Sequence, residues 1–268
     1  MRHAGGELLV RLRRPLAAAA AFGSFFLAWE ISVRLLAVPD YLLPPPSLVA
    51  RELAGRWPRV LDAARVTGSE ILAGYALAIL VSVPLALLIA GSRLVERTIY
   101  PLVVLLQIVP KIAIAPLFII WFGFGFTPKL LLVFLLCFFP IVVGAVAGFK
   151  SVDPDVLDLG RSTGASAWRL FTKIRLPQAL PELFTGLKVG AALAATAAVV
   201  AEFVASNRGL GYLLLEYNGN LETAMVFAVI IVLSLMGLAL YGVVELLERL
   251  AIPWHARHRG VGEPLPGA

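Results

Sequence analysis

Long apolar segments alternate with short polar segments along most of this chain. Each apolar segment holds about 20 residues, the length that an α-helix needs to cross the hydrocarbon core of a bilayer. The segments lack the strict alternation of apolar and polar positions that indicates a β-strand. We therefore predict an all-α, polytopic membrane protein. The six predicted transmembrane helices cover residues 16–38, 70–90, 99–121, 130–149, 183–205 and 221–247.

The composition supports this prediction and excludes several other classes of protein. Hydrophobic residues make up 60% of the chain and charged residues 15%, with a mean hydropathy of +0.89, whereas soluble domains are about 45–50% apolar and about 25% charged. Such a chain is neither disordered nor, with Cys137 as its single cysteine, a disulfide scaffold. The net charge of +6 does not indicate nucleic-acid binding, because the basic residues lie in short loops and near the chain ends.

The basic residues also predict how the helices are oriented. If the N-terminus is cytoplasmic, fourteen Lys and Arg residues lie on the cytoplasmic side and six on the external side. An excess of these residues marks the cytoplasmic side of a membrane protein, so both termini are predicted to be cytoplasmic. The predicted regions are a basic cytoplasmic tail (1–15), the first transmembrane helix (16–38), an external segment (39–67), a core transmembrane domain (68–250) and a cytoplasmic C-terminal tail (251–268).

The N-terminal part of the chain allows a second interpretation. Its Arg-rich start and Ala-rich run also fit a cleaved signal peptide, although the length of the apolar run favours a retained helix. Glu30 and Arg34 lie four residues apart, so we expect them to form an ion pair on one helix face. In the external segment, Ser47 follows three prolines and is predicted to be the N-cap of a short amphipathic helix.

The loop at residues 153–177 carries the clearest local signals. Asp153 is a plausible N-cap and Pro154 suits the first helical position, so a short helix is predicted to about residue 163. Gly164 can take the left-handed conformation that ends a helix. Ser166 is then predicted to cap a second short helix.

Both loop helices are amphipathic and too short to cross a membrane. The second is predicted to run to about Arg175, with Pro177 and Pro181 ending it and starting the next span. An amphipathic helix outside the membrane needs a surface against which to bury its apolar face. That surface is either the protein's own helix ends or a groove on a soluble partner, and the physics alone favours neither.

The residues of this loop resemble the EAA loop of ABC-importer permeases, whose pattern is E-A-A-x3-G-x9-I-x-L-P. Here Asp158-Leu159-Gly160 is followed at the same spacing by Gly164, Ile174 and Leu176-Pro177. Asp replaces Glu, and Leu-Gly replaces Ala-Ala. The resemblance implies that the loop couples the chain to an ATPase. The residues it assigns to coupling are Asp158, Gly160, Gly164, Ala165, Trp168, Phe171, Ile174, Leu176 and Pro177.

Other segments are similar to one subfamily of these permeases, which imports aliphatic sulfonates, taurine, nitrate and related small solutes. They are residues 43–47, 109–117, 121–123, 201–202 and 209–212, and the resemblance covers roughly residues 40–250. It implies a type I ABC-importer permease fold with cytoplasmic coupling helices, in a bacterial inner membrane. It also implies a second permease copy forming a homodimer, two cytoplasmic ATPase subunits and an external solute-binding protein.

Polar residues inside a membrane are costly and default to functional candidates. Gln107 and Lys111 share a face of the third predicted span, and Pro110 and Pro116 interrupt the same helix. A proline frees backbone carbonyls, which can line a cavity. We therefore assign this face to the translocation pathway, where the Lys111 ammonium would suit an anionic solute. The alternatives are that Lys111 extends to the membrane surface or pairs with a carboxylate.

Glu202 is the other candidate for the pathway. It lies toward the external end of the fifth predicted span. Three alternatives remain open for its carboxylate: an ion pair with Arg208, a contact with the binding protein, or exposure at the membrane surface.

Enzymatic chemistry is not indicated. The sequence has no G-x-x-x-x-G-K-[ST] phosphate loop, so ATP and Mg²⁺ are expected on a partner ATPase and no cofactor on this chain. The histidines lie in the tails, which argues against a metal site. The main alternative function is a self-contained secondary carrier or channel, which predicts inverted repeats that are not visible. A membrane-embedded enzyme is a third hypothesis, and sulfonates, taurine, nitrate and a pyrimidine vitamin precursor all remain open as solutes.

Overall fold

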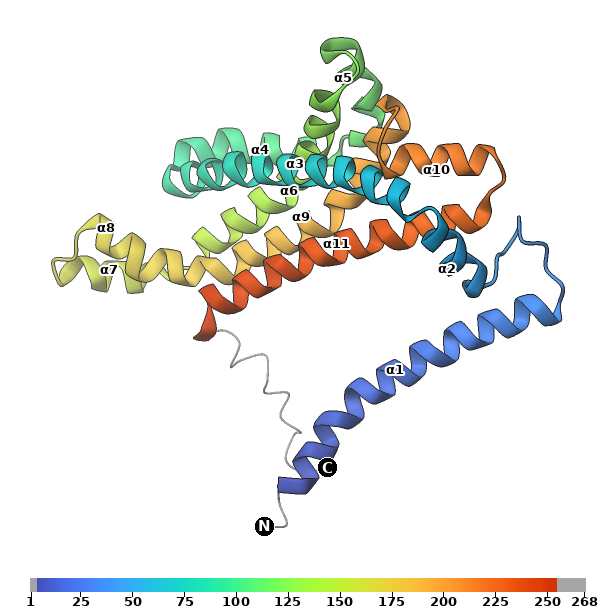
Figure 1. The fold of residues 1–268 in the computed structure, drawn as a ribbon. Helices are drawn as coiled ribbons and strands as arrows, with labels where there is room; N and C mark the ends of the chain where they lie inside the picture. Colours follow the sequence, from blue (N-terminus) through green and yellow to red (C-terminus); the bar gives the residue numbers. More distant parts are fainter. Residues whose placement is uncertain (1–3, 255–268) are drawn as a thin grey trace. The chain divides into compact units, whose positions relative to one another are not determined.

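Helices account for most of the chain in the computed structural model, which describes residues 4–254 and the side chains of residues 20–254 except residue 205 (Figure 1). The described residues contain no β-strand, so the predicted all-α class is confirmed. Residues 1–3 and 255–268 of the predicted tails lie outside the described part. The elements are α1 (Ala4–Leu35), α2 (Pro46–Gly55), α3 (Trp57–Gly91), α4 (Arg93–Ile108), the 3-10 helix η1 (Lys111–Ile114), α5 (Ala115–Phe122), α6 (Phe126–Lys150), α7 (Pro154–Ser162), α8 (Ala167–Leu170), the π-helix η2 (Phe171–Arg175), α9 (Leu176–Ala205), α10 (Leu210–Gly219) and α11 (Thr223–Ala251).

Two compact units make up the chain, and each is described by itself. One comprises Met1–Leu61 and Leu213–Ile231, and the other comprises Asp62–Tyr212 and Val232–Ala268. The second unit, called the larger unit below, contains α4 to α9 and most of α3 and α11.

The helices α6 and α9 cross at close range in the larger unit. Their crossing is built on glycine: a Cβ atom added to Gly144 would lie 2.8 Å from the Cα atom of Gly186, and one added to Gly148 would lie 2.5 Å from the carbonyl oxygen of Ala179. Gly144 and Gly148, like Gly186 and Gly190, are spaced four apart and so share a helix face. Small residues at this spacing let helix backbones touch in a membrane, where helices associate by close packing.

Alanines continue this packing along α9. Ala191, Ala194, Ala197 and Ala198 are fully buried in a core that includes side chains of α3 and α6. Small side chains on one helix allow the larger apolar side chains of its neighbours to fill the space between them. This apolar core of the larger unit is therefore tightly packed.

Four described helices are long and apolar enough to cross a membrane: Trp57–Gly91, Phe126–Lys150, Ala167–Val204 and Thr223–Ala251. They contain most of the spans predicted at 70–90, 130–149, 183–205 and 221–247. In each helix, only 28–44% of the apolar 18-residue stretch that qualifies it is buried inside the protein. The remaining apolar surface is available to lipid. The first predicted span lies mostly in α1, whose side chains are described only from residue 20, so the count of six helices stays a prediction.

The third predicted span is not one straight helix: the interruption predicted at Pro110 is observed. α4 ends at Ile108, and the Lys111–Phe122 segment continues at an angle of 86° to it. Pro110 stands at the break, with φ −66° and ψ 89°. Its ring and its missing N–H group prevent the helix from continuing through this position. Together the two pieces are either a broken span or a re-entrant segment.

In the smaller unit, the beginning of α2 is tied to α1 by a carboxylate. Glu30 pairs with Arg34, as predicted, and also accepts hydrogen bonds from the Ser47 backbone N–H at 3.0 Å and the Ser47 hydroxyl at 2.8 Å. Ser47 is therefore not the N-cap of α2: Pro45 takes that position, and the Ser47 side chain turns to α1 instead. The prediction of a short helix here was right and its cap was wrong.

Candidate functional site

The 153–177 loop forms the predicted pair of helices with the predicted caps. The Asp153 carboxylate accepts a hydrogen bond from the Asp155 N–H at 2.9 Å, and α7 follows with Pro154 in its first turn. Gly164 has φ +77°, and Ser166 caps α8 by accepting from the Arg169 N–H at 3.4 Å. These short-range signals fix the bend between the two helices.

Close contact between α7 and α8 explains two residues of the EAA-like pattern. A Cβ atom added to Gly160 would lie 2.5 Å from the Leu170 Cδ2 atom and 3.5 Å from the Ile174 Cδ1 atom. Leu157 and Leu170 are both 8% exposed. Gly160 and Ile174 therefore help to close the α7–α8 hairpin (Figure 1).

Some apolar side chains of the hairpin remain open. Trp168 is 72% exposed, Leu159 67% and Val156 38%. We call these three residues the exposed loop surface. Phe171, by contrast, lies between Trp168 and the end of α6, with ring centroids 6.1 Å from Trp168 and 6.4 Å from Phe149. One part of the loop thus packs against the end of α6. Another part leaves apolar surface exposed, where a partner protein could bind.

The second loop helix does not end where the prolines were predicted to end it. α8, η2 and α9 form one helical segment, Ala167–Val204. The Leu176 N–H bonds the Phe171 carbonyl five residues back, which makes one π turn. Pro177 stands in the first turn of α9, where its missing N–H costs little, and Pro181 is tolerated within α9.

The residues assigned to the pathway on the third span surround the helix break. The Lys111 Nζ atom donates to the Gln107 carbonyl oxygen at 2.6 Å and lies 4.6 Å from the centroid of the Phe139 ring. The break at Pro110 frees that carbonyl, and a cation at a helix C-terminus is favourable. Pro116 stands in the first turn of α5. The partner of Lys111 is thus a backbone carbonyl rather than a carboxylate.

Glu202 belongs to a different set of residues. Thr67, Glu70, Lys129 and Glu202, called the buried polar cluster, are each at most 6% exposed. The Glu202 carboxylate accepts from the Thr67 hydroxyl at 2.7 Å and from the Gly211 N–H. Of the three alternatives left open for Glu202, the structure shows neither an ion pair with Arg208 nor exposure at the membrane surface.

Glu70 and Lys129 were missed as candidates from the sequence. Glu70 stood at the predicted start of a span, and Lys129 fell between the third and fourth predicted spans. In the structure Lys129 lies in the first turn of α6 and forms a buried ion pair with Glu70 of α3. The residues are far apart in sequence, so no local pattern joins them.

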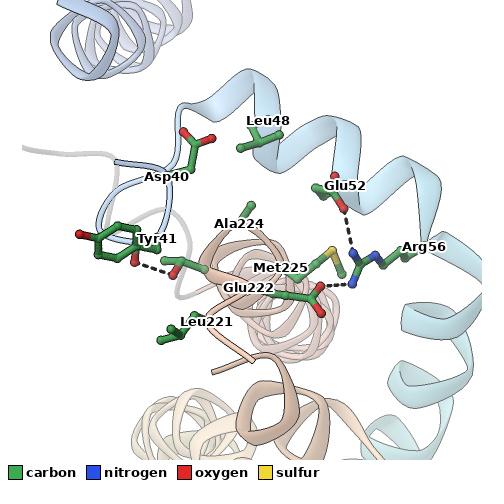
Figure 2. A pocket seen from close by; sticks show the side chains of 10 residues that line it. Asp40, Tyr41, Leu48, Glu52, Arg56, Leu221, Glu222, Ala224 and Met225 are labelled. Atoms are coloured by element: carbon green, nitrogen blue, oxygen red, sulfur yellow. Dashed lines mark hydrogen bonds and ion pairs between the residues drawn. The ribbon is translucent and has the colours of Figure 1, made fainter. Parts of the chain in front are cut away.

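A pocket of about 430 Å³ lies in the smaller unit, between residues 40–41, α2 and the start of α11 (Figure 2). Arg56 pairs there with Glu222 and, at 3.3 Å, with Glu52, and the Glu222 carboxylate raises the pKa of the Arg56 guanidinium. The Thr223 hydroxyl donates to the Tyr41 carbonyl at 2.7 Å. These polar groups of the pocket thus form ion pairs and hydrogen bonds with one another.

Metal chemistry finds no support in the described part of the chain. Among residues 4–254, no three His, Cys, Asp or Glu side chains come together as a metal site. Cys137 is buried, and its thiol donates to the Gly190 carbonyl at 3.3 Å.

Known proteins resemble the chain over most of its length. A family model described as "Binding-protein-dependent transport system inner membrane component" matches residues 82–252. The chain belongs to this family. It is 36% identical to the formylaminopyrimidine transport permease protein ThiX of Halalkalibacterium halodurans, over 85% of this chain and 92% of that protein. It is 32% identical to the taurine transport system permease protein TauC of Escherichia coli, over 85% of each chain.

The fold agrees with this membership. An inward-facing structure of the MetNI methionine ABC transporter superposes with a TM-score of 0.63 and 15% identity, over 74% of this chain and 98% of that chain. The chain is therefore a permease of the ABC-transporter class, a transport subunit and not an enzyme, as predicted. The resemblance to sulfonate and taurine permeases is confirmed, and the self-contained carrier and the membrane enzyme lose their support.

Proposed function

We propose that this permease forms the translocation pathway of an ATP-driven, binding-protein-dependent importer and couples to a separate ATPase through residues 153–177. The exposed loop surface carries this proposal. Trp168 and Leu159 remain more than half exposed on the α7–α8 hairpin, and an aromatic anchor of this kind is typical of an interface hot spot. The other coupling residues position the hairpin.

The partners in this proposal are two cytoplasmic ATPase subunits that bind ATP and Mg²⁺, an external solute-binding protein and a second copy of this chain. Exposed apolar side chains of the broken span are open to a membrane-embedded neighbour as well as to lipid: Leu105 is 60% exposed, Ile120 75% and Trp121 62%. The excess of basic residues in alternate loops supports cytoplasmic termini in a bacterial inner membrane.

Changing Trp168 to glutamate should weaken ATPase binding about 30-fold or more, because a hot-spot aromatic is lost and a charge enters an apolar contact. Trp254→Glu is the matched control, since Trp254 is 52% exposed and is predicted to lie on the same side of the membrane. Binding of the purified ATPase to the permease in nanodiscs measures the effect. Equal binding by the two variants would contradict the role of the exposed loop surface.

We further propose that the solute is a small molecule or ion with an anionic group, such as a sulfonate, taurine or nitrate. The support is Lys111, whose ammonium lies at the break of the third predicted span. The formylaminopyrimidine permease among the relatives makes a pyrimidine solute the competing hypothesis.

Changing Lys111 to glutamine should lower taurine uptake about tenfold or more, which is the effect of losing one hydrogen bond to a charged group. Uptake is measured in proteoliposomes with the ATPase and the binding protein. Lys111→Arg keeps the charge and should retain most of the uptake. Equal losses in both variants would indicate that Lys111 only caps α4.

A further inference from the structure

The buried polar cluster joins three helices of the larger unit. α3 contributes Thr67 and Glu70 from one face, α6 contributes Lys129 and α9 contributes Glu202. Thr67, Glu70 and Glu202 are fully buried, and Lys129 is 6% exposed. Ionisable groups without contact to water must be matched in charge and hydrogen bonding, so each partner has to be accounted for.

Donors and acceptors in the cluster do not match if both carboxyl groups are ionised. The Lys129 ammonium pairs with one Glu70 oxygen and donates to the Ser206 hydroxyl at 3.1 Å. Glu202 accepts from Thr67 on one oxygen and from the Gly211 N–H on the other. The second Glu70 oxygen is buried without a protein donor, and the Glu202 carboxyl group lies within hydrogen-bonding reach of Glu70. A donor is therefore missing between the two acids.

The charges do not match either. Two carboxylates face one ammonium, which leaves one negative charge in surplus. In the part of the chain whose side chains the structure describes, no further charged side chain is paired with the cluster: Arg208 is exposed, and α5 packs nearby through the apolar Ala115 and Phe118. The N-terminus of α10 carries a partial positive charge. Its Gly211 N–H already donates a hydrogen bond to the Glu202 carboxylate.

We propose that the cluster is a binding site for one proton, shared between the carboxyl groups of Glu70 and Glu202. A proton taken from water converts one carboxylate into a carboxylic acid, whose O–H donates to the other carboxylate. This supplies the missing donor and cancels the surplus charge, while Lys129 remains an ammonium. Loss of the proton leaves a buried negative charge where α3, α6 and α9 meet, so the packing of these helices depends on pH.

Infrared spectroscopy of the full-length permease in D₂O tests the proposal, because the C=O stretch of a carboxylic acid is separate from that of a carboxylate. At neutral pH the wild type should show one buried carboxylic acid. Glu70→Gln and Glu202→Gln should each show none, because Lys129 balances the carboxylate that remains. Lys129→Gln should show two. Glu96→Gln is the control, since Glu96 pairs with Lys150 outside the cluster and is 39% exposed, and it should match the wild type.

The pattern across the variants makes the proposal falsifiable. Absence of a carboxylic acid band in the wild type would overturn it, as would loss of the band in only one of the two glutamine variants, which would place the proton on a single residue.

A second measurement on the wild type does not depend on whether Lys129→Gln folds. A folded state that holds one proton more than the unfolded state loses stability as pH rises, with a tenfold increase in the unfolding constant per pH unit. This slope should begin above the range where exposed carboxyl groups titrate, should end where the folded cluster itself releases its proton, and should be absent in both glutamine variants. A wild type whose unfolding constant is independent of pH across this range would contradict the proposal.

Discussion

A Gly186→Leu permease should lose its stable fold. A Cβ atom at this position would lie 2.7 Å from the Pro140 carbonyl oxygen and 3.2 Å from the Gly144 Cα atom, and leucine adds three further carbons. These neighbours are backbone atoms, which cannot move away by a change of rotamer. The helices α6 and α9 must therefore separate along their crossing. We expect a loss of about 3 kcal/mol or more in the free energy of unfolding, at the upper end of overpacking effects.

Gly242→Leu is the matched control for this prediction. A Cβ atom at Gly242 meets nothing within 4 Å, and the residue is exposed in the apolar helix α11, so the variant should stay within about 0.5 kcal/mol of the wild type. Unfolding in mixed micelles, followed by tryptophan fluorescence, compares the two variants. A Gly186→Leu protein as stable as the control would show that the crossing is looser than the structure indicates.

Gly209→Ala should be the second most damaging of the predicted substitutions. Gly209 has φ +106°, which disfavours any residue with a Cβ atom, and that atom would collide with the Glu202 carboxylate. Backbone strain accounts for about 1–3 kcal/mol, and displacement of the buried carboxylate adds to it. We expect a total loss of about 3–4 kcal/mol.

The chain supplies a matched control for Gly209→Ala. Gly164 also has a positive φ, +77°, but a Cβ atom there meets nothing within 4 Å. Gly164→Ala should therefore show only the strain, about 1 kcal/mol, and the difference between the variants isolates the contact with Glu202. Equal losses in the two thermal or denaturant unfolding experiments would mean that Glu202 is free to move away.

Local chemistry explains which parts of the loop could be predicted from the sequence. Asp153, Gly164 and Ser166 act on backbone groups within three residues of themselves, so their roles follow from the order of residues alone. The long apolar runs likewise predicted most of the observed long helices. The caps and the bend of the hairpin are therefore determined by short segments of sequence.

Prolines were harder to interpret, because their effect depends on position within the helix. Pro110 interrupts its helix, as predicted, whereas Pro116 stands at the start of α5 and Pro177 lies in a continuous helix that was predicted to end. The π turn before Pro177 takes up its steric demand by shifting one hydrogen bond to the residue five positions back. A sequence pattern does not distinguish these outcomes without the surrounding packing.

The buried polar cluster could not be assembled from the sequence. Glu70, Lys129 and Glu202 meet only because three helices cross, and such crossings depend on packing over the whole unit. Glu202 was noticed as a charged residue in an apolar helix, but the only side-chain partner considered for it within the chain, Arg208, is near it in sequence. Long-range partners of this kind are missed by any local search.

The unbroken helix from Ala167 to Val204 gives the permease a mechanical element. Its 38 residues form a rod about 57 Å long at 1.5 Å per residue, with Trp168 near one end and Glu202 near the other. A force applied at the tip of the hairpin is transmitted along this rod without passing through a flexible loop. A displacement of the hairpin would therefore be transmitted along this helix to the turn between α9 and α10.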